Sequence, residues 1–134
     1  MQTRKTIKLL VVDEQTGYCD LIREHAEICS HNIEILCECV NSGKEAIQKI
    51  ASWKPSVILL DAHLKDVNSF EVLDSCREGR ATVVVASDFC SREIMDSARL
   101  HGASGYVTKS ESPEEIEALL SELATVSAPI ELEH

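Results

Sequence analysis

The stretch Val57-Ile58-Leu59-Leu60-Asp61 decides the fold of this chain. Four consecutive apolar residues lead, with no alternation of polar side chains, into a single carboxylate. A strand that is apolar on both faces is typical of a parallel sheet covered by helices on both sides. We therefore expect a buried parallel strand that places Asp61 at its carboxyl end.

Length and composition favour one ordinary globular domain. The chain has 134 residues, of which 44% are hydrophobic, and a formal net charge of −10. Phosphate contacts need clustered Lys and Arg, so this charge argues against direct binding of nucleic acid and favours a bound cation or a partner with a basic face. No apolar run approaches the roughly 20 residues of a membrane span. We expect a cytoplasmic protein with no membrane contact.

Six cysteines are spread through apolar patterns, at positions 19, 29, 37, 39, 76 and 90. They lack the regular spacing of a disulfide-rich secreted scaffold, so we expect small buried thiols. Cys37 and Cys39 form the one close pair. A zinc site there would need two further ligands at suitable spacing, and the sequence offers none.

Four further strands are predicted at residues 7–12, 33–40, 82–86 and 104–107. Helices are predicted between them, at about 16–29, 43–53, 70–79 and 91–100, and after Pro113. Ser42 and Glu45 form a capping box at the start of the second helix, and Ser112 caps the last one. The pattern predicts an α/β fold with a single doubly wound, five-stranded parallel sheet of order 2-1-3-4-5, a flavodoxin-like three-layer sandwich.

The domain is expected to span residues 5–125. Residues 126–131 are rich in small residues and in proline, as at the start of a linker. We interpret residues 132–134 as the remnant of a histidine tag, and the whole as a domain cut from a longer protein.

Polar side chains follow the predicted strands at one edge of the sheet. Asp13 and Glu14 follow the first strand, Ser87 and Asp88 the fourth, and Lys109 the fifth. Lys109 is two strands from Asp61, about 10 Å at roughly 4.8 Å per strand, which a lysine side chain can bridge. Crowded carboxylates favour Mg²⁺, and a carboxylate flanked by an ammonium and a hydroxyl suits phosphoryl transfer to Asp61.

These residues resemble the receiver domains of bacterial two-component response regulators. The matching segments are Val11-Val12-Asp13-Glu14, Leu59-Leu60-Asp61, Val85-Ala86-Ser87 and Gly102-Ala103-Ser104-Gly105-Tyr106-Val107-Thr108-Lys109. They occur in the order and spacing of that family, over about residues 5–125.

The resemblance implies a role for each matching residue. Asp61 would be the phosphoacceptor, Ser87 and Lys109 would contact the phosphoryl oxygens, and Tyr106 would act with Ser87 as the conformational switch. Mg²⁺ would be held by Asp13, Glu14, Asp61 and the backbone carbonyl of His63. The domain would not be a free-standing enzyme, since it would catalyse only its own phosphorylation and dephosphorylation.

The resemblance also implies partners. A sensor histidine kinase would donate the phosphoryl group, and the surface of helix 4, strand 5 and helix 5 would control an output domain or form a homodimer. Lys109 is followed by Ser110 rather than proline, a pattern common in receivers attached to a helix-turn-helix DNA-binding domain. Transcriptional output is therefore expected.

The sequence departs from the family pattern at four positions near Asp61. Glu14 stands where a second Asp is common, Lys65 replaces a proline, and Ser69 replaces a glycine that often follows. Asp88 occupies a position usually held by Ala or Gly. Its carboxylate would oppose an incoming phosphate, so Asp88 is a candidate modulator of phosphorylation.

Three alternatives compete with this interpretation. A degenerate receiver would be a phosphorylation-independent interaction module. A haloacid-dehalogenase-type phosphatase would need a second acid two residues after the nucleophile, where His63 stands instead. A flavin-binding flavodoxin-like protein would need a Gly- and Ser/Thr-rich phosphate loop, and residues 14–17 form a poor one.

Overall fold

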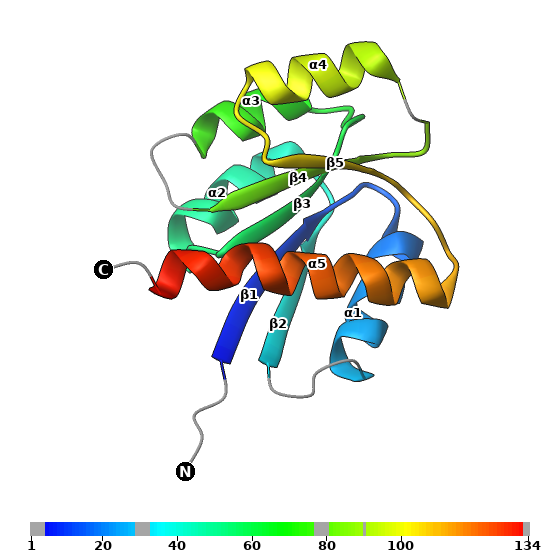
Figure 1. Cartoon of the computed structure of the whole chain (residues 1–134). Helices are drawn as coiled ribbons and strands as arrows, with labels where there is room; N and C mark the ends of the chain where they lie inside the picture. The colour runs from blue at the N-terminus through cyan, green and yellow to red at the C-terminus, as the bar shows by residue number, and fades with distance from the viewer. Residues whose placement is uncertain (1–4, 29–32, 77–80, 90, 133–134) are drawn as a thin grey trace.

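Strands and helices alternate along the whole described part of the chain. The computed structural model describes residues 5–28, 33–76, 81–89 and 91–132 (Figure 1). The elements are β1 (Lys5–Val12), α1 (Thr16–Ile28), β2 (Ile33–Val40), α2 (Gly43–Trp53), β3 (Val57–Asp61), α3 (Ser69–Ser75), β4 (Thr82–Ser87), α4 (Arg92–Leu100), β5 (Gly105–Thr108) and α5 (Pro113–Leu132).

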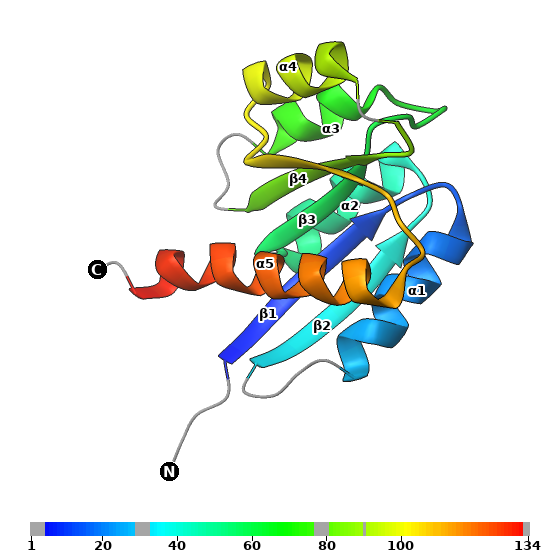
Figure 2. The same ribbon diagram turned by 45° about the vertical axis from the view of Figure 1, so that its right-hand side comes forward.

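The five strands form one parallel sheet in the order β2-β1-β3-β4-β5. Both views of the ribbon show the crossover that this order requires, with β1 and β3 side by side in the middle (Figure 2). The predicted fold class and strand order are confirmed.

Helices cover both faces of the sheet. Apolar residues of α1 and α5 pack with one set of strand side chains, and those of α2, α3 and α4 pack with the other. Along β1 the two sets alternate, since Leu9 and Val11 belong to the first cluster and Leu10 and Val12 to the second. All five residues of β3 are buried, as expected for the central strand. None of the helices in the described ranges is long and apolar enough to cross a bilayer.

The helix boundaries follow local chemistry. The Ser42 hydroxyl accepts the Glu45 N–H at 3.2 Å, so the predicted cap of α2 is confirmed. Lys54 ends this helix in a left-handed conformation, with φ of 53°. Helix α3 ends at Ser75, before the predicted end near Gly79, which lies outside the described residues.

Helix α5 continues to Leu132, through residues where the composition predicted irregular backbone. Loss of the apolar period removes the signal for packing on the sheet, but a helix that is already formed extends at little cost. That residues 126–131 lead into a linker, and that residues 132–134 are a tag remnant, stay predictions.

The expectation that all cysteines are isolated thiols is wrong for one pair. A disulfide joins Cys19 of α1 to Cys39 of β2, with the Cα atoms 6.1 Å apart. The apolar pattern that predicted burial is also what packs α1 on β2, and spacing along the chain does not indicate which residues then meet. Cys37 and Cys76 are free thiols. Cys29 and Cys90 lie outside the described residues.

Candidate functional site

The carboxyl ends of β1, β3, β4 and β5 meet at one edge of the sheet, where parallel sheets of this order bind ligands. Asp61 is the last residue of β3 and pairs in register with Ala86 of β4. Asp13 directly follows β1, and Lys109 directly follows β5. We call Asp13, Asp61 and Lys109 the acid pocket.

The side chain of Lys109 bridges the width of two strands, as predicted. Its Nζ lies 2.7 Å from Oδ2 of Asp13 and 3.4 Å from Oδ1 of Asp61, and its side chain is only 8% exposed. The Lys109 N–H donates to the Ser87 carbonyl at 2.8 Å, which fixes the base of this side chain. Burial alone would lower the pKa of Lys109, but the hydrogen bond to Asp13 and the charges of Asp61, Asp13 and Asp88 together raise it. The ammonium is therefore retained at neutral pH.

Asp13 is buried and held by β2 as well as by its own turn. Its N–H donates to the Val40 carbonyl at 3.1 Å, and the Asn41 amide donates to its carbonyl at 3.1 Å. Its Oδ1 accepts the Gln15 N–H at 2.8 Å. Its buried Oδ2 has no hydrogen bond of ordinary geometry and faces the Lys109 ammonium. This oxygen therefore already binds a cationic group.

Asp61 is buried, and opposing electrostatic effects act on the pKa of its carboxyl group. The His63 N–H donates to its Oδ1 at 3.0 Å. Burial raises the pKa of Asp61 and the charge of Asp13 raises it further, while the His63 hydrogen bond and Lys109 act in the opposite direction. The net result is a raised pKa, because desolvation of the carboxylate is the largest effect.

This raised pKa gives a stability prediction. A carboxyl group whose pKa is higher in the folded than in the unfolded protein destabilises the fold once pH rises through its folded pKa. We expect Asp61→Asn to be more stable than the parent at pH 7, with the difference vanishing in acid, in urea unfolding over a pH series. Asp66→Asn is the control of opposite sign, because hydrogen bonds from the Gly43 and Lys44 N–H groups lower the pKa of Asp66. If the unfolding free energy depended on pH in the same way in both variants, the raised pKa of Asp61 would be contradicted.

Glu14 closes the loop between β3 and α3. Its Oε2 accepts the Lys65 N–H at 2.8 Å, at the position where the family pattern has a proline without an N–H.

Within the described residues, no group of three His, Cys, Asp or Glu side chains is arranged to hold a metal ion. Asp13, Glu14, Asp61 and the His63 carbonyl therefore stay predicted metal ligands. Their oxygen donors suit Mg²⁺, and one oxygen of the Glu14 carboxylate is already engaged by the loop amide.

Ser69 and Asp66 hold the other end of this loop. The buried Ser69 hydroxyl donates to the Asp61 carbonyl at 2.6 Å. Asp66 accepts the N–H groups of Gly43 at 2.9 Å and Lys44 at 3.1 Å, at the start of α2. The expected change in loop shape at Lys65 and Ser69 thus takes the form of side-chain anchors. The sequence marked Ser69 as unusual but gave no sign of Asp66.

Ser87 and Tyr106 both hold Phe89 and make no hydrogen bond to Asp61. The buried Ser87 Oγ accepts the Phe89 N–H at 3.2 Å. The Tyr106 hydroxyl donates to the Phe89 carbonyl. The two predicted switch residues therefore meet at one residue of the loop between β4 and α4, and this residue is 72% exposed. Their switching stays a prediction.

Asp88 lies beside the acid pocket and is exposed. It lines a hollow of about 320 Å³ together with Gln15, Gly17, Tyr18, Leu21, Lys109, Ser110 and Glu111. Its charge acts on Tyr18 and Lys109, whose pKa values it helps to raise. The structure thus brings the predicted modulator near Lys109.

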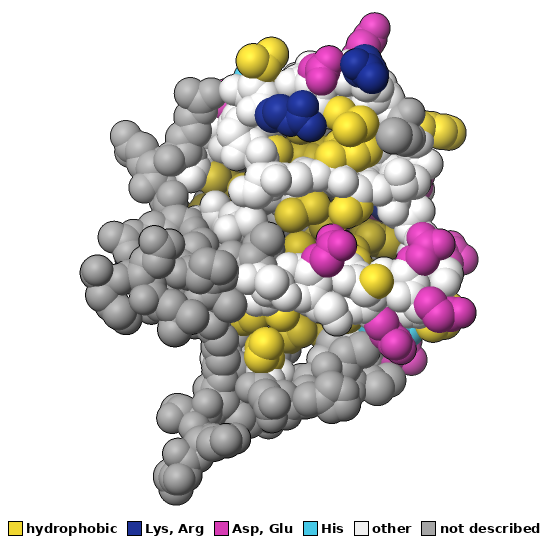
Figure 3. Space-filling view, viewed as in Figure 1, with side chains coloured by type: hydrophobic (Ala, Val, Ile, Leu, Met, Phe, Trp, Pro, Cys, Tyr) yellow, Lys and Arg dark blue, Asp and Glu magenta, His cyan; other side chains and the backbone are white. Residues whose placement is uncertain are grey.

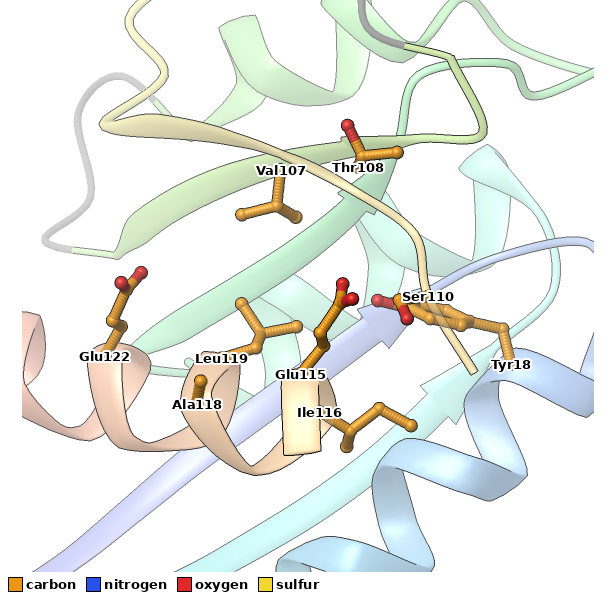
Figure 4. Close-up of a pocket in the computed structure, with 9 residues that line it drawn as sticks. All are labelled: Tyr18, Val107, Thr108, Ser110, Glu115, Ile116, Ala118, Leu119 and Glu122. Atoms are coloured by element: carbon orange, nitrogen blue, oxygen red, sulfur yellow. The ribbon is translucent and has the colours of Figure 1, made fainter. Parts of the chain in front are cut away.

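Tyr18 is a contact that the sequence did not indicate. Its ring centroid lies 5.4 Å from the Lys109 Nζ, a cation–π arrangement. It also closes one end of a second hollow of about 230 Å³ between β5 and α5. In Figure 4, Val107 and Leu119 point toward each other across this hollow. A tyrosine on the apolar face of a predicted helix has no pattern that distinguishes it from core packing.

Comparison with known protein families identifies one family. The family model of the response regulator receiver domain matches residues 9–121. The transcriptional regulatory protein TrcR of Mycobacterium tuberculosis is 29% identical over 127 residues, covering 93% of this chain and 48% of that protein. The nitrate/nitrite response regulator NarL of Escherichia coli K12 is 29% identical over 130 residues, covering 92% of this chain and 57% of that protein.

Solved structures agree on the fold. The receiver domain of a putative LuxO repressor protein from Vibrio parahaemolyticus has a TM-score of 0.79 at 21% identity, covering 98% of this chain and all (100%) of that one. The receiver domain of the putative response regulator NarL from Mycobacterium tuberculosis has a TM-score of 0.77 at 21% identity, covering 90% and 98%. The chain spans about half the length of the curated relatives TrcR and NarL. The strand order, the acid pocket and the family match over residues 9–121 lead to one conclusion: this chain belongs to the response regulator receiver domain family.

Proposed function

We propose that this receiver domain accepts a phosphoryl group from a sensor histidine kinase onto Asp61, with Mg²⁺, and so controls an output domain. The observation that carries the proposal is the acid pocket, in which the Lys109 ammonium lies 2.7 Å and 3.4 Å from two buried carboxylates. A buried carboxylate beside a fixed ammonium can act as nucleophile toward phosphorus while the ammonium stabilises the charge on the phosphoryl oxygens.

The donor set fits Mg²⁺. The buried Asp13 Oδ2 already faces a cation, the Lys109 ammonium, and the carboxylates of Asp61 and Glu14 and the His63 carbonyl offer further hard oxygens. The bound ion would neutralise charge on the phosphoryl group during transfer. The chain's own residues do the rest: Asp61 attacks, the His63 N–H orients its Oδ1, and Lys109 moves from the carboxylates to the phosphoryl oxygens.

Ser87 and Tyr106 would transmit the change. A phosphoryl oxygen on Asp61 is a charged, and therefore strong, acceptor for the Ser87 hydroxyl. The Ser87 side chain would turn toward it, lose its hydrogen bond from the Phe89 N–H and so release the loop. Tyr106 and the surface of α4, β5 and α5 would follow. Figure 3 shows apolar side chains on this face between α4 and α5, and acidic ones where α5 begins, where Glu114 and Glu115 lie.

Relatives support an output through transcription. TrcR is named a transcriptional regulatory protein, and EvgA of Escherichia coli K12 a DNA-binding transcriptional activator. A relative from Geobacillus kaustophilus, 32% identical over 116 residues, is instead a protein-glutamate methylesterase/protein-glutamine glutaminase. Our proposal is a DNA-binding output domain, with this domain cytoplasmic and a homodimer through α4, β5 and α5.

The test is incubation with acetyl phosphate and Mg²⁺, followed by intact mass. We expect a gain of one phosphoryl group in the parent and none in Asp61→Ala. The control is Asp74→Ala, which removes an exposed carboxylate of α3 and should leave uptake unchanged. Uptake that persists in Asp61→Ala would place the acceptor elsewhere.

The second candidate is a degenerate receiver that acts without phosphorylation. One observation favours it: the Glu14 carboxylate is engaged by the Lys65 N–H. No uptake at saturating phosphodonor and Mg²⁺, in a protein that is folded by circular dichroism, would support this candidate and refute the first.

Asp88 gives a prediction about rate. Its carboxylate opposes an incoming phosphate through space, so we expect Asp88→Ala to take up the phosphoryl group about threefold faster at low salt, with the gain shrinking as salt screens the charge. Asp96→Ala, which removes an exposed acid of α4, is the matched control. Unchanged uptake kinetics in Asp88→Ala would refute the modulating role.

A further inference from the structure

We propose that Cys19 and Cys39 form a reversible redox site whose oxidation state is coupled to the geometry of the acid pocket. The redox site is argued from the contact between Cys19 and Cys39 alone. Its effect on phosphoryl uptake rests on the proposed function, and the experiment below tests the redox site and this effect separately.

Ordinary packing of α1 on β2 brings the pair together. Cys19 is 1% exposed, and Cys39 is half-buried on the strand that α1 covers. Their Cα atoms are 6.1 Å apart, within the range that a disulfide spans without displacement of the backbone. The two thiols therefore remain neighbours when the bond is reduced.

The position of Cys37 accounts for the pairing of Cys19 with Cys39 rather than with Cys37. It precedes Cys39 by two residues on the same strand, so the two side chains leave the same face of β2. Cys37, however, lines a hollow with Arg23 and Ala26, which lie about one and two turns further along α1 than Cys19. Burial raises the pKa of the Cys37 thiol to about 11, which leaves it almost fully protonated at neutral pH. Cys37 is thus a free thiol beside the pair and provides a matched control.

Each cysteine of the pair is one residue from a contact to the acid pocket. Tyr18, whose ring lies 5.4 Å from the Lys109 Nζ, precedes Cys19. Val40, whose carbonyl accepts the Asp13 N–H at 3.1 Å, follows Cys39. The disulfide therefore fixes α1 against β2 beside the residues that position the ammonium and one carboxylate.

The oxidant is a hydroperoxide, which reaches the half-buried Cys39 before the buried Cys19. The Cys39 thiolate attacks one peroxide oxygen, giving a sulfenic acid, and the hydroxide that leaves takes up the thiol proton as water. The Cys19 thiolate then attacks the Cys39 sulfur, and the second hydroxide leaves as water with the Cys19 proton. Two thiols lose two electrons and two protons, and hydrogen peroxide becomes two waters. A dithiol reverses the change by exchange.

Oxidation is expected to order the acid pocket. With α1 tied to β2, Tyr18 and Asp13 keep the positions that hold Lys109, so less motion must be frozen when the phosphoryl group arrives. We expect the oxidised protein to take up the phosphoryl group about fivefold faster than the reduced protein, a coupling of ordinary size between two sites. The Asp13 amide should exchange its hydrogen more slowly in the oxidised form.

The experiment compares the parent, Cys39→Ala and Cys37→Ala after hydrogen peroxide or dithiothreitol. Intact mass and peptide mapping should show loss of two hydrogens and a Cys19–Cys39 link in the parent and in Cys37→Ala, and no such link in Cys39→Ala. Exchange of the Asp13 amide and uptake from acetyl phosphate should depend on redox state in the parent and in Cys37→Ala, and not in Cys39→Ala.

The possible outcomes test the redox site, its coupling to the acid pocket and the proposed function separately. No link between Cys19 and Cys39 under peroxide, or a link that dithiothreitol cannot remove from the folded protein, overturns the redox site. A reversible link with equal amide exchange in both states overturns the coupling. A reversible link with redox-dependent amide exchange supports the proposal even where neither form takes up phosphoryl groups, a result that refutes only the proposed function. Because the parent is compared with itself, the test does not depend on the folding of Cys39→Ala.

Discussion

Replacing Lys109 with methionine is expected to slow phosphoryl uptake by about 100-fold, the usual cost of removing one fixed donor from a charge-stabilising site. Methionine keeps the length and apolar stem of the side chain, so the loss isolates the ammonium. The rate is measured by intact mass over time with acetyl phosphate and Mg²⁺. A loss smaller than about fivefold would contradict the role of Lys109 as the principal positive charge of the pocket.

The same variant is expected to lose stability at neutral pH. Asp13 and Asp61 are both buried, and the ammonium is the cation placed between them. Without it two carboxylates face each other in a poorly solvated site, which costs about 3 kcal/mol for a buried charge left without its partner. Urea unfolding at pH 7 measures this loss. At low pH Asp61, whose pKa is raised, takes up a proton, so the difference in unfolding free energy between variant and parent should narrow.

Lys49→Met is the matched control for charge removal. Lys49 pairs with Glu38 at the surface, where its side chain is 32% exposed. Exposed pairs contribute little, so we expect less than about 1 kcal/mol. Equal losses in Lys49→Met and Lys109→Met would mean that net charge, and not the buried cluster, sets the stability.

Much of the fold and of the acid pocket could be predicted from the sequence because both depend on chain-local signals. The buried run of β3, the acid after β1 and the lysine after β5 each follow a strand, and parallel strands bring their carboxyl ends to one edge. Lys109 had to span the distance between strands, and the length of its side chain made that predictable.

What could not be predicted depends on lateral contacts. The Cys19–Cys39 link, the Tyr18 ring beside Lys109 and the Asp66 bonds to α2 join residues whose separation in the sequence carries no periodic signal. The continuation of α5 past Thr125 was also missed, because composition describes packing better than it describes where a helix ends.

Gly43→Ala is expected to destabilise the protein by about 2 kcal/mol, because a new methyl group would overlap a neighbour that cannot rotate away. A Cβ at position 43 would lie 2.8 Å from the Cβ of Val67 and 3.4 Å from the Asp66 Oδ1. A Cβ atom moves only with its backbone, so the loop between β3 and α3 must shift. That shift would break the Asp66 bonds to the Gly43 and Lys44 N–H groups and move His63, whose N–H orients Asp61.

Gly17→Ala is the control for the same chemical change. Gly17 lies in α1, and a Cβ there meets nothing within 4 Å. Alanine favours a helix over glycine, so this variant should gain up to about 1 kcal/mol. The double variant Gly43→Ala/Val67→Gly removes the overlap and should recover part of the lost stability and of the phosphoryl uptake. Val67→Gly alone can only weaken the loop. Recovery in the double variant would therefore show that the close approach of α2 to this loop holds Asp61 in position. Additive losses of stability in the double variant would exclude this role of the close approach.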